Sequence, residues 1–265
     1  MSEAATSAAP PLVTVQVDDT VATFTLNRPE KRNAISLRLV SALAQAIEEL
    51  SDDVKVIVLA GSGAHFSAGL DLSELHAMSA AEGVFHSQAW YEVFAKLQFG
   101  RRPVVAVLHG AVVGGGLELA SCAHVRVADD TAYFGLPEGQ RGIFLGGGGS
   151  VRVTKLIGVS RVTEMMLTGR TYDAQQAFQI GLVHHAVPAG TGMAKARELA
   201  LRIAGNAPMS NYAILRALPL IAEQPMEHGL LTEALMASVT QSEPEAKARM
   251  EAFLTKRAGK VEHNR

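Results

Sequence analysis

The stretch Val104-Val-Ala-Val-Leu-His-Gly-Ala-Val-Val-Gly114-Gly-Gly-Leu-Glu118 decides the fold, because it holds a strand, a turn and the start of a helix in immediate succession. Val104–Leu108 is a short apolar run rich in β-branched residues, which predicts a strand buried on both faces. The glycines at 114–116 then predict a turn into a helix that carries Glu118 in its first turn. This order of elements is typical of an α/β sheet.

A second apolar run with a similar continuation lies earlier in the chain. Residues 54–59 predict another buried strand, followed by the loop His65-Phe-Ser-Ala-Gly69-Leu-Asp-Leu72. Loops at the carboxyl ends of strands are where α/β sheets bind ligands. Where such loops lead into helices, they present unpaired backbone N–H groups at the positive end of the helix dipole. Two such donors directed at one point would form an oxyanion hole for a thioester carbonyl.

The chain as a whole divides into an α/β part and a helical part. Apolar residues at helical spacing predict a helix over residues 36–50 with Ser36 as its N-cap. The other expected elements are a hairpin over 13–26, strands over 125–127, 132–135 and 182–187, and helices over 84–99, 151–157, 161–167, 174–179, 194–204, 211–222, 230–239 and 245–256. We therefore expect a disordered tail over 1–11, an α/β core over 12–195 and a helical region over 196–265.

The composition narrows the class of protein. The chain has 265 residues, 48% hydrophobic and 19% charged, which favours an oligomer with apolar interfaces. Its net charge of −2 gives no electrostatic footprint for nucleic acid. No apolar run is long enough for a membrane span, and the first residues lack the pattern of a signal or transit peptide, so we expect a cytoplasmic protein. Cys122, the single cysteine, lies in an apolar run and is expected to be a buried structural thiol.

Glu118 and Glu138 are the candidate catalytic pair. Taken alone, Glu118 would complement the helix dipole, and Glu138, which follows Pro137, would pass as a solvated loop charge. Taken together, they match the two tasks of adding water to an enoyl thioester. One carboxylate deprotonates the water that attacks Cβ, and a second group delivers a proton to Cα.

Four segments resemble the successive signatures of the enoyl-CoA hydratase/isomerase (crotonase) family, in the family's order and spacing. They are Asn27-Arg-Pro-x-x-x-Asn33-Ala34, Phe66-Ser-Ala-Gly-Leu-Asp71-Leu, Gly110-x-x-x-Gly-Gly-Gly-x-Glu118-Leu-Ala and Phe134-Gly-x-Pro-Glu138. The resemblance implies a crotonase-like α/β fold, which is a spiral of ββα units. It also implies that the helical C-terminal region assembles trimers, usually paired into hexamers.

The same resemblance implies which backbone groups bind the thioester. The oxyanion hole is expected in the loops that contain Ala68, Gly69, Leu70 and Gly115. Its two donors would be the N–H groups of Leu70 and Gly115. Glycine at these places keeps a Cβ from blocking the substrate oxygen.

The resemblance also separates the reactions within the family. Enzymes similar to enoyl-CoA hydratases have a glutamate at both matching positions, so we assign Glu118 to the water and Glu138 to the Cα proton. Relatives that isomerise double bonds or cleave C–C bonds usually keep only one. A third alternative is a non-catalytic, RNA-binding family member, which the acidic balance and the two glutamates disfavour. The expected substrate is an acyl-CoA, with no further cofactor and no metal.

Arg141 departs from the hydratase pattern, in which apolar residues follow the Pro-Glu pair. Three interpretations stay open: it points to solvent, it pairs with Glu138 and lowers the pKa of that acid, or it contacts a polar or carboxylated acyl group. Contacts to the CoA or acyl part are expected from Lys31, Asp71, Leu72 and Arg141, with Lys256, Arg257 and Lys260 as further candidates for the CoA phosphates.

Several other residues allow both a structural and a functional interpretation. Trp90 and Tyr91 either line the acyl pocket or pack on a helix face. Asp71 is expected to cap a short helix that follows Leu70. His65 either contacts the CoA or lies at the surface of its loop.

Overall fold

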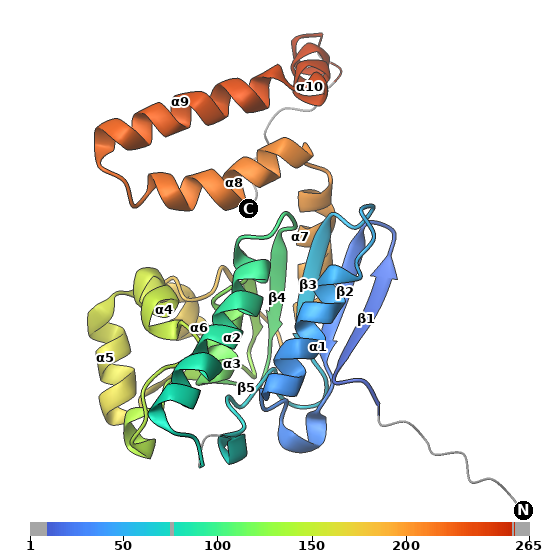
Figure 1. Ribbon diagram of the computed structural model, residues 1–265. Coiled ribbons are helices and arrows are strands. Elements are labelled where there is room, and N and C mark those ends of the chain that lie inside the picture. The colour runs from blue at the N-terminus through green and yellow to red at the C-terminus, as the bar shows by residue number, and fades with distance from the viewer. Residues whose placement is uncertain (1–9, 75–76, 256, 258–265) are drawn as a thin grey trace, which may run out of the picture. The chain divides into compact units, whose positions relative to one another are not determined.

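The computed structural model describes residues 10–74, 77–255 and 257, and Figure 1 shows the arrangement of its elements. The chain divides into two compact units after Ala204, which are described separately below. The tail expected over residues 1–11 lies almost entirely outside the described residues, as do Lys256 and Lys260.

The first unit is built on two β-sheets. The larger has the strand order β1-β2-β3-β4-β6-β9, and the smaller has the order β5-β7-β8. β1 pairs antiparallel with β2, and every later neighbour in the larger sheet is parallel. The strands are β1 Val13–Asp18, β2 Val21–Leu26, β3 Val56–Gly61, β4 Val104–Leu108, β5 Ala111–Val113, β6 Val125–Asp129, β7 Tyr133–Gly135, β8 Thr171–Asp173 and β9 His185–Val187.

The two sheets are linked by a repeated step along the chain. After β4 the chain enters the smaller sheet as β5 and continues into α3 (Gly115–Ala120), and after β6 it enters the same sheet as β7. After β3, Ser67 makes a single parallel bridge to Val112 of β5 before the chain reaches α2. These steps are the repeating ββα unit, so the expected fold class is confirmed.

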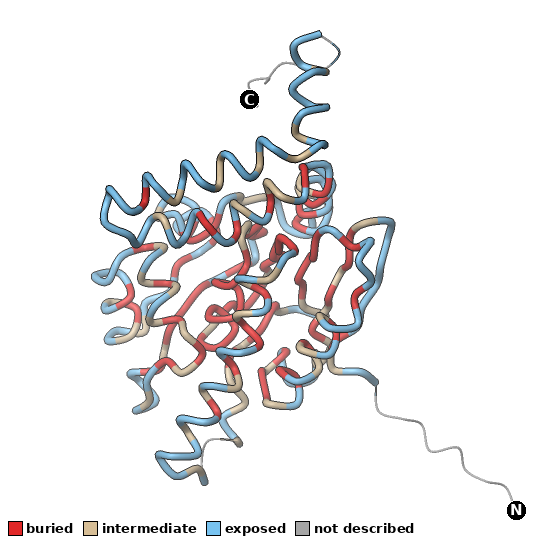
Figure 2. Tube along the Cα trace, turned by 45° about the horizontal axis from the view of Figure 1, so that its top comes forward, coloured by how far each residue is buried: buried red, intermediate tan, exposed pale blue. Residues whose placement is uncertain are grey.

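Helices cover both faces of the larger sheet. Successive side chains of β3 point to opposite faces of the sheet. Ile57 and Leu59 therefore pack in one core with α1, whereas Val56 and Val58 pack in a second core with alanines of α7. Figure 2 shows the buried residues concentrated in these strands. The helices of the first unit are α1 Leu37–Glu48, α2 Ala80–Gln98, α3 Gly115–Ala120, α4 Gly149–Ile157, α5 Val159–Thr168, α6 Ala174–Gln179 and α7 Gly192–Ala204, with 3₁₀ turns η1 Pro29–Lys31, η2 Leu72–Glu74 and η3 Gly139–Arg141.

Most expected elements are confirmed, and the differences have local causes. The Ser36 hydroxyl accepts a hydrogen bond from Leu39 N and caps α1 as predicted. The second helix starts at Ala80, four residues before the expected start, because Ser79 and Glu82 form a capping box ahead of the apolar pattern. The expected strand over 182–187 is shorter, and the three-residue strands β5 and β8 were not predicted, since so few residues show no period of two.

Asn33 ties the first family-like segment to the loop after β3. Its side-chain amide donates to the carbonyls of Ser62 and His65, and its Oδ1 accepts from Arg28 N. The residue is fully buried and has a φ of 52°, a conformation in which asparagine is tolerated better than most residues. Ser67 Oγ donates to the Asn33 carbonyl. This network fixes the backbone that leads to Gly69 and Leu70.

The second unit is helical. It contains α8 Pro208–Ile221, α9 Met226–Ser242 and α10 Pro244–Leu254, and α8 packs against α9. α9 leaves several large apolar side chains exposed, namely Met226, Leu230, Leu231, Leu235 and Val239. Across the described parts of the chain, no helix combines the length and the apolar character needed to cross a membrane.

Candidate active site

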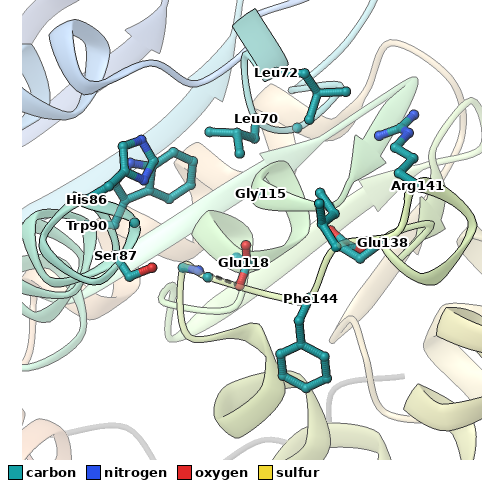
Figure 3. Close-up of a pocket in the computed structure, with 16 residues that line it drawn as sticks. Leu70, Leu72, His86, Ser87, Trp90, Gly115, Glu118, Glu138, Arg141 and Phe144 are labelled. Atoms are coloured by element: carbon teal, nitrogen blue, oxygen red, sulfur yellow. Dashed lines mark hydrogen bonds between the residues drawn. The ribbon is translucent and has the colours of Figure 1, made fainter. Parts of the chain in front are cut away.

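A pocket of the first unit lies where the two sheets approach α2 and α3. It encloses roughly 630 Å³, including the space at its open mouth. Figure 3 shows Glu118 and Glu138 in this pocket with Gly115 beside them, and with His86, Ser87 and Trp90 on the wall formed by α2. The pocket is lined by Gly69, Leu70, Leu72, Gly83, His86, Ser87, Trp90, Gly114, Gly115, Glu118, Glu138, Arg141, Ile143, Phe144, Gly146 and Gly147.

Two backbone N–H groups that meet in this pocket have no acceptor among the described residues. Ile35 N donates to Gly69 O and Asp71 N donates to Ile35 O, which leaves the amide of Leu70 directed away from Ile35. Gly115 is the first residue of α3, where an amide has no intrahelical acceptor. Neither Leu70 N nor Gly115 N donates to any other residue that the structure describes. The two amides expected to form the oxyanion hole are therefore adjacent and available.

Glycine is required where these two loops approach each other. A Cβ on Gly115 would lie 3.2 Å from Leu70 N and 3.0 Å from the Trp90 ring. A Cβ on Gly69, which has a φ of +105°, would lie 2.8 Å from the Val113 carbonyl. Any larger residue would separate the loops or block the space between the two amides.

Glu118 is held in place by a second glycine-rich loop. The residue is only 4% exposed, and its Oε1 accepts hydrogen bonds from Gly147 N and Gly149 N, both at 2.8 Å. Burial raises the pKa of Glu118 above its ordinary value and outweighs the two amide hydrogen bonds and the charge of Arg152, which lower it. The side chain is thus fixed in the pocket with its negative charge partly stabilised.

The four glycines at 146–149 are the feature whose role the sequence did not reveal. Four glycines in a row allow either a flexible hinge or a loop of close approach, and in the structure they form a loop of close approach. A Cβ on Gly147 would lie 2.9 Å from Glu118 Oε2, and one on Gly149 would lie 2.7 Å from Glu118 Cγ. The run of glycines indicated that another part of the protein approaches this loop closely, but the sequence did not reveal that the approaching group is Glu118.

Glu138 has a different environment. It lies in the turn after β7, is 7% exposed, and its Oε2 has no hydrogen-bond partner in the part of the chain that the structure describes. A Cβ on Gly114 would lie 2.8 Å from Glu138 Oε1, so the carboxyl group rests against that glycine. Burial, with a further contribution from the charge of Glu118, raises the pKa of Glu138 to about 7. Glu138 can therefore hold a proton near neutral pH.

Arg141 lines the pocket and is exposed to solvent. The charge of Arg141 lowers the pKa of Glu138, as expected if the two residues interact. Burial has the larger effect, so the pKa of Glu138 lies above its ordinary value. No ion pair between Arg141 and Glu138 is found within 10–74, 77–255 and 257. In Figure 3, Arg141 lies beyond Glu138, away from His86 and Trp90.

The other expected contacts fall into two groups. Leu72 lines the pocket, whereas Lys31 is exposed in η1 and does not line it. Asp71 accepts from Ser73 N, which caps η2 as predicted, and pairs with Arg28 at 2.8 Å. Ala68 is not among the lining residues, and its amide donates to the Arg32 carbonyl.

The remaining candidates are mainly structural. Trp90 lines the pocket, but its neighbour Tyr91 is exposed outside it. His65 Nδ1 accepts from Ala111 N and so joins the loop to β5. Burial raises the pKa of Cys122 to about 12, in agreement with an inert thiol. His86, which lines the pocket, was not singled out from the sequence, because a lone histidine on a helix gives no signal.

Comparisons with known proteins agree with this geometry. Residues 16–264 match the family described as enoyl-CoA hydratase/isomerase. The chain belongs to that family. It is 36% identical over 258 residues to the probable enoyl-CoA hydratase echA8 of Mycobacterium bovis, covering 95% of this chain and 98% of that protein. It is 34% identical over 236 residues to the 2,3-dehydroadipyl-CoA hydratase of Escherichia coli K12, covering 88% and 92%.

Solved structures show the same likeness. A crystal structure from Rhodopseudomonas palustris CGA009, provisionally assigned as an enoyl-CoA hydratase, has a TM-score of 0.91 and 52% identity, covering 96% of this chain and 98% of that one. The enoyl-CoA hydratase of Thermoplasma volcanium GSS1 has a TM-score of 0.87 and 31% identity, covering 92% and 98%. The chain is thus an enzyme of the enoyl-CoA hydratase type.

The raised pKa of Glu138 predicts a pH-dependent stability. The native carboxyl has a pKa of about 7 and the unfolded one about 4.5, so the native state retains a proton that the unfolded state has lost. The stabilisation of the native state by this retained proton is complete below about pH 4.5 and is lost as the pH rises through 7. Glutamine does not ionise, so the difference in unfolding free energy between Glu138→Gln and wild type should shift by about 2 kcal/mol in favour of the variant from pH 5.5 to pH 8.

Urea unfolding at several pH values measures this difference. The control is Glu92→Gln, which neutralises an exposed glutamate of α2 and should follow wild type at every pH. If the unfolding free energies of wild type and Glu138→Gln changed with pH in parallel, Glu138 would ionise in the native state as readily as in the unfolded chain.

Proposed function

We propose that the enzyme adds water to a 2-enoyl-CoA to give a 3-hydroxyacyl-CoA. The observation that carries the proposal is a pair of buried carboxyl groups in different environments, beside two amides that have no acceptor among the described residues. Glu118 receives two hydrogen bonds from amides, whereas Glu138 has a pKa of about 7 and an oxygen with no hydrogen-bond partner in the described parts of the chain. Hydration needs a base and an acid on one substrate, and this difference between the two groups supplies both.

The first step is polarisation of the thioester. With its carbonyl oxygen between Leu70 N and Gly115 N, the substrate gains two hydrogen bonds as negative charge develops on that oxygen. These donors are backbone groups fixed by the Asn33 network and by the start of α3, so they need no rearrangement. Polarisation makes Cβ electrophilic.

The two glutamates then perform the addition. Glu118, whose negative charge is stabilised by Gly147 N and Gly149 N, takes a proton from water as the oxygen attacks Cβ. Glu138 delivers its proton to Cα, which completes the product. In these steps the two amides and the two glutamates act on the substrate without a metal or an additional cofactor. Coenzyme A takes part only as a portion of the substrate.

Two other functions in the family remain alternatives to hydration. A double-bond isomerase or a C–C lyase would use the same oxyanion hole with one of the glutamates. A non-catalytic RNA-binding member would need neither. The buried, unpartnered oxygen of Glu138 favours hydration, because an unused buried carboxyl group would only cost stability.

The proposal predicts dependence on both glutamates. Glu118→Gln and Glu138→Gln should each reduce kcat for crotonyl-CoA by about 10²- to 10⁴-fold, since each removes one proton transfer. In wild type, kcat should fall as the pH rises above about 7, because Glu138 loses the proton that it must donate. Loss of the enoyl absorbance measures the rate, and Glu92→Gln serves as the control.

The outcomes separate the alternatives. Dependence on Glu118 alone, with a shifted double bond or a cleaved product, would contradict hydration in favour of isomerase or lyase chemistry. Tight RNA binding without turnover of any enoyl-CoA would favour the non-catalytic alternative.

For the acyl group, we propose a chain that ends in a carboxylate held by Arg141. Arg141 is exposed at the pocket without an ion-pair partner among the described residues, and a guanidinium group binds carboxylates in a fork of parallel hydrogen bonds. The relative from Escherichia coli is named for a substrate of this kind, 2,3-dehydroadipyl-CoA.

Arg141→Ala should therefore raise the KM for 2,3-dehydroadipyl-CoA by about tenfold or more and leave the KM for crotonyl-CoA nearly unchanged. Steady-state kinetics with both substrates measures this difference. The role of Arg141 would be contradicted by two results together. Wild type would turn over crotonyl-CoA normally, and Arg141→Ala would turn over both substrates as fast as wild type does.

We also propose that residues 196–265 assemble the chain into trimers, paired or unpaired, and that the enzyme is cytoplasmic. The exposed apolar side chains of α9 support an interface, since five of them lie on one 17-residue helix. For the CoA phosphates, Lys31 and Arg257 are the described candidates, and both are exposed.

A further inference from the structure

Arg152 lies on α4, outside the pocket lining and behind the loop that holds Glu118. Its side chain is partly buried. Nη1 donates to the Gly147 carbonyl at 2.9 Å, and Nε donates to Gln98 Oε1 at 2.6 Å. Gln98 is the last residue of α2, so the guanidinium group joins the end of that helix to the glycine loop.

Gly148 makes room for this contact. It has a φ of +91°, and a Cβ there would lie 2.1 Å from Arg152 Nη1. The left-handed backbone favours glycine at 148, and the guanidinium group fills the space that a Cβ would take. Arg152 is partly buried, and its Nη1 and Nε are both hydrogen-bonded.

The contact continues through Gly147 to the carboxylate. The carbonyl of Gly147 accepts from Arg152, while the N–H of the same residue donates to Glu118 Oε1 at 2.8 Å. Gly149 N donates to the same oxygen from the first residue of α4. A displacement of the loop would therefore remove both donors to Glu118 at once.

We propose that Arg152 is a positioning residue for Glu118: it fixes the amides of Gly147 and Gly149 on the carboxylate and supplies the positive charge that favours its ionised form. The consequence for catalysis rests on the proposed function, in which Glu118 is the base. Arg152 acts through the loop and does not touch the substrate.

The charged groups around Glu118 leave this role to Arg152. Glu138, in the turn after β7, has the same sign of charge as Glu118 when it ionises, and Cys122, two residues after the end of α3, is neutral because its pKa is raised to about 12. From α2, His86 reaches the same pocket. Arg152 is the cation whose charge lowers the pKa of Glu118 against the effect of burial.

Arg152→Gln tests the role, because glutamine keeps a hydrogen-bond donor but removes the charge. With crotonyl-CoA we expect kcat to fall by about 10- to 100-fold with little change in KM, as for a displaced catalytic group. The acidic limb of the pH profile should move to higher pH, since Glu118 then ionises less readily. Arg152→Lys keeps the charge and should leave that limb near its wild-type position.

Arg102→Gln is the matched control. Arg102 is a buried arginine that also donates to backbone carbonyls, those of Leu50, Ser51 and Val54. These carbonyls belong to the turn between α1 and β3, away from Glu118. Its loss should lower the melting temperature without moving the pH profile. If Arg152→Gln behaved in the same way, Arg152 would be merely structural and the proposal would be overturned.

A readout independent of turnover separates this proposal from the proposed function. Infrared difference spectra against Glu118→Gln report the carboxylate of Glu118 directly, and its titration should move to higher pH in Arg152→Gln. If wild type hydrates no enoyl-CoA, the proposed function fails while this titration still tests Arg152. An unchanged titration overturns the inference about Arg152. Should Arg152→Gln fail to fold, Gln98→Leu removes the acceptor of Nε and should move the titration in the same direction by a smaller amount.

Discussion

The site depends on one constraint: a carboxylate buried in the protein must be hydrogen-bonded where it lies. Glu118 meets this constraint with two backbone amides of the loop at 146–149, both on one oxygen. The other oxygen is thereby left to face the pocket. Because the donors are backbone groups at the start of α4, the position of the carboxylate is set by the path of the chain itself.

The fold brings these parts together through its repeated passage between two sheets. The step after β3 delivers Leu70, the step after β4 delivers Gly115 and Glu118, and the step after β6 delivers Glu138. Each step ends near the same edge, so segments far apart in the sequence surround one pocket (Figure 3). Glycines at the points of contact allow the loops to approach closely enough for this.

Much of the architecture could be predicted from the sequence, because buried strands and amphipathic helices leave periodic patterns. The strand at Val104–Leu108 and the helix at Ala174–Gln179 are confirmed to the residue. The three-residue strands β5 and β8 were missed, since pairing with distant segments and not local preference makes them strands. For the site, the resemblance indicated Glu118 and Glu138, and the structure brings both into one pocket. The two amides that donate to Glu118 lie 29 and 31 positions further along the chain, and Arg152 contacts Gln98 across 54 positions, which no local pattern reveals.

A crystal structure with an unreactive enoyl-CoA analogue tests the central claim most directly. The account predicts the thioester oxygen within hydrogen-bond distance of both Leu70 N and Gly115 N, with Cβ toward Glu118 and Cα toward Glu138. A thioester bound away from these two amides, or an acyl chain with only one glutamate near its double bond, would contradict it.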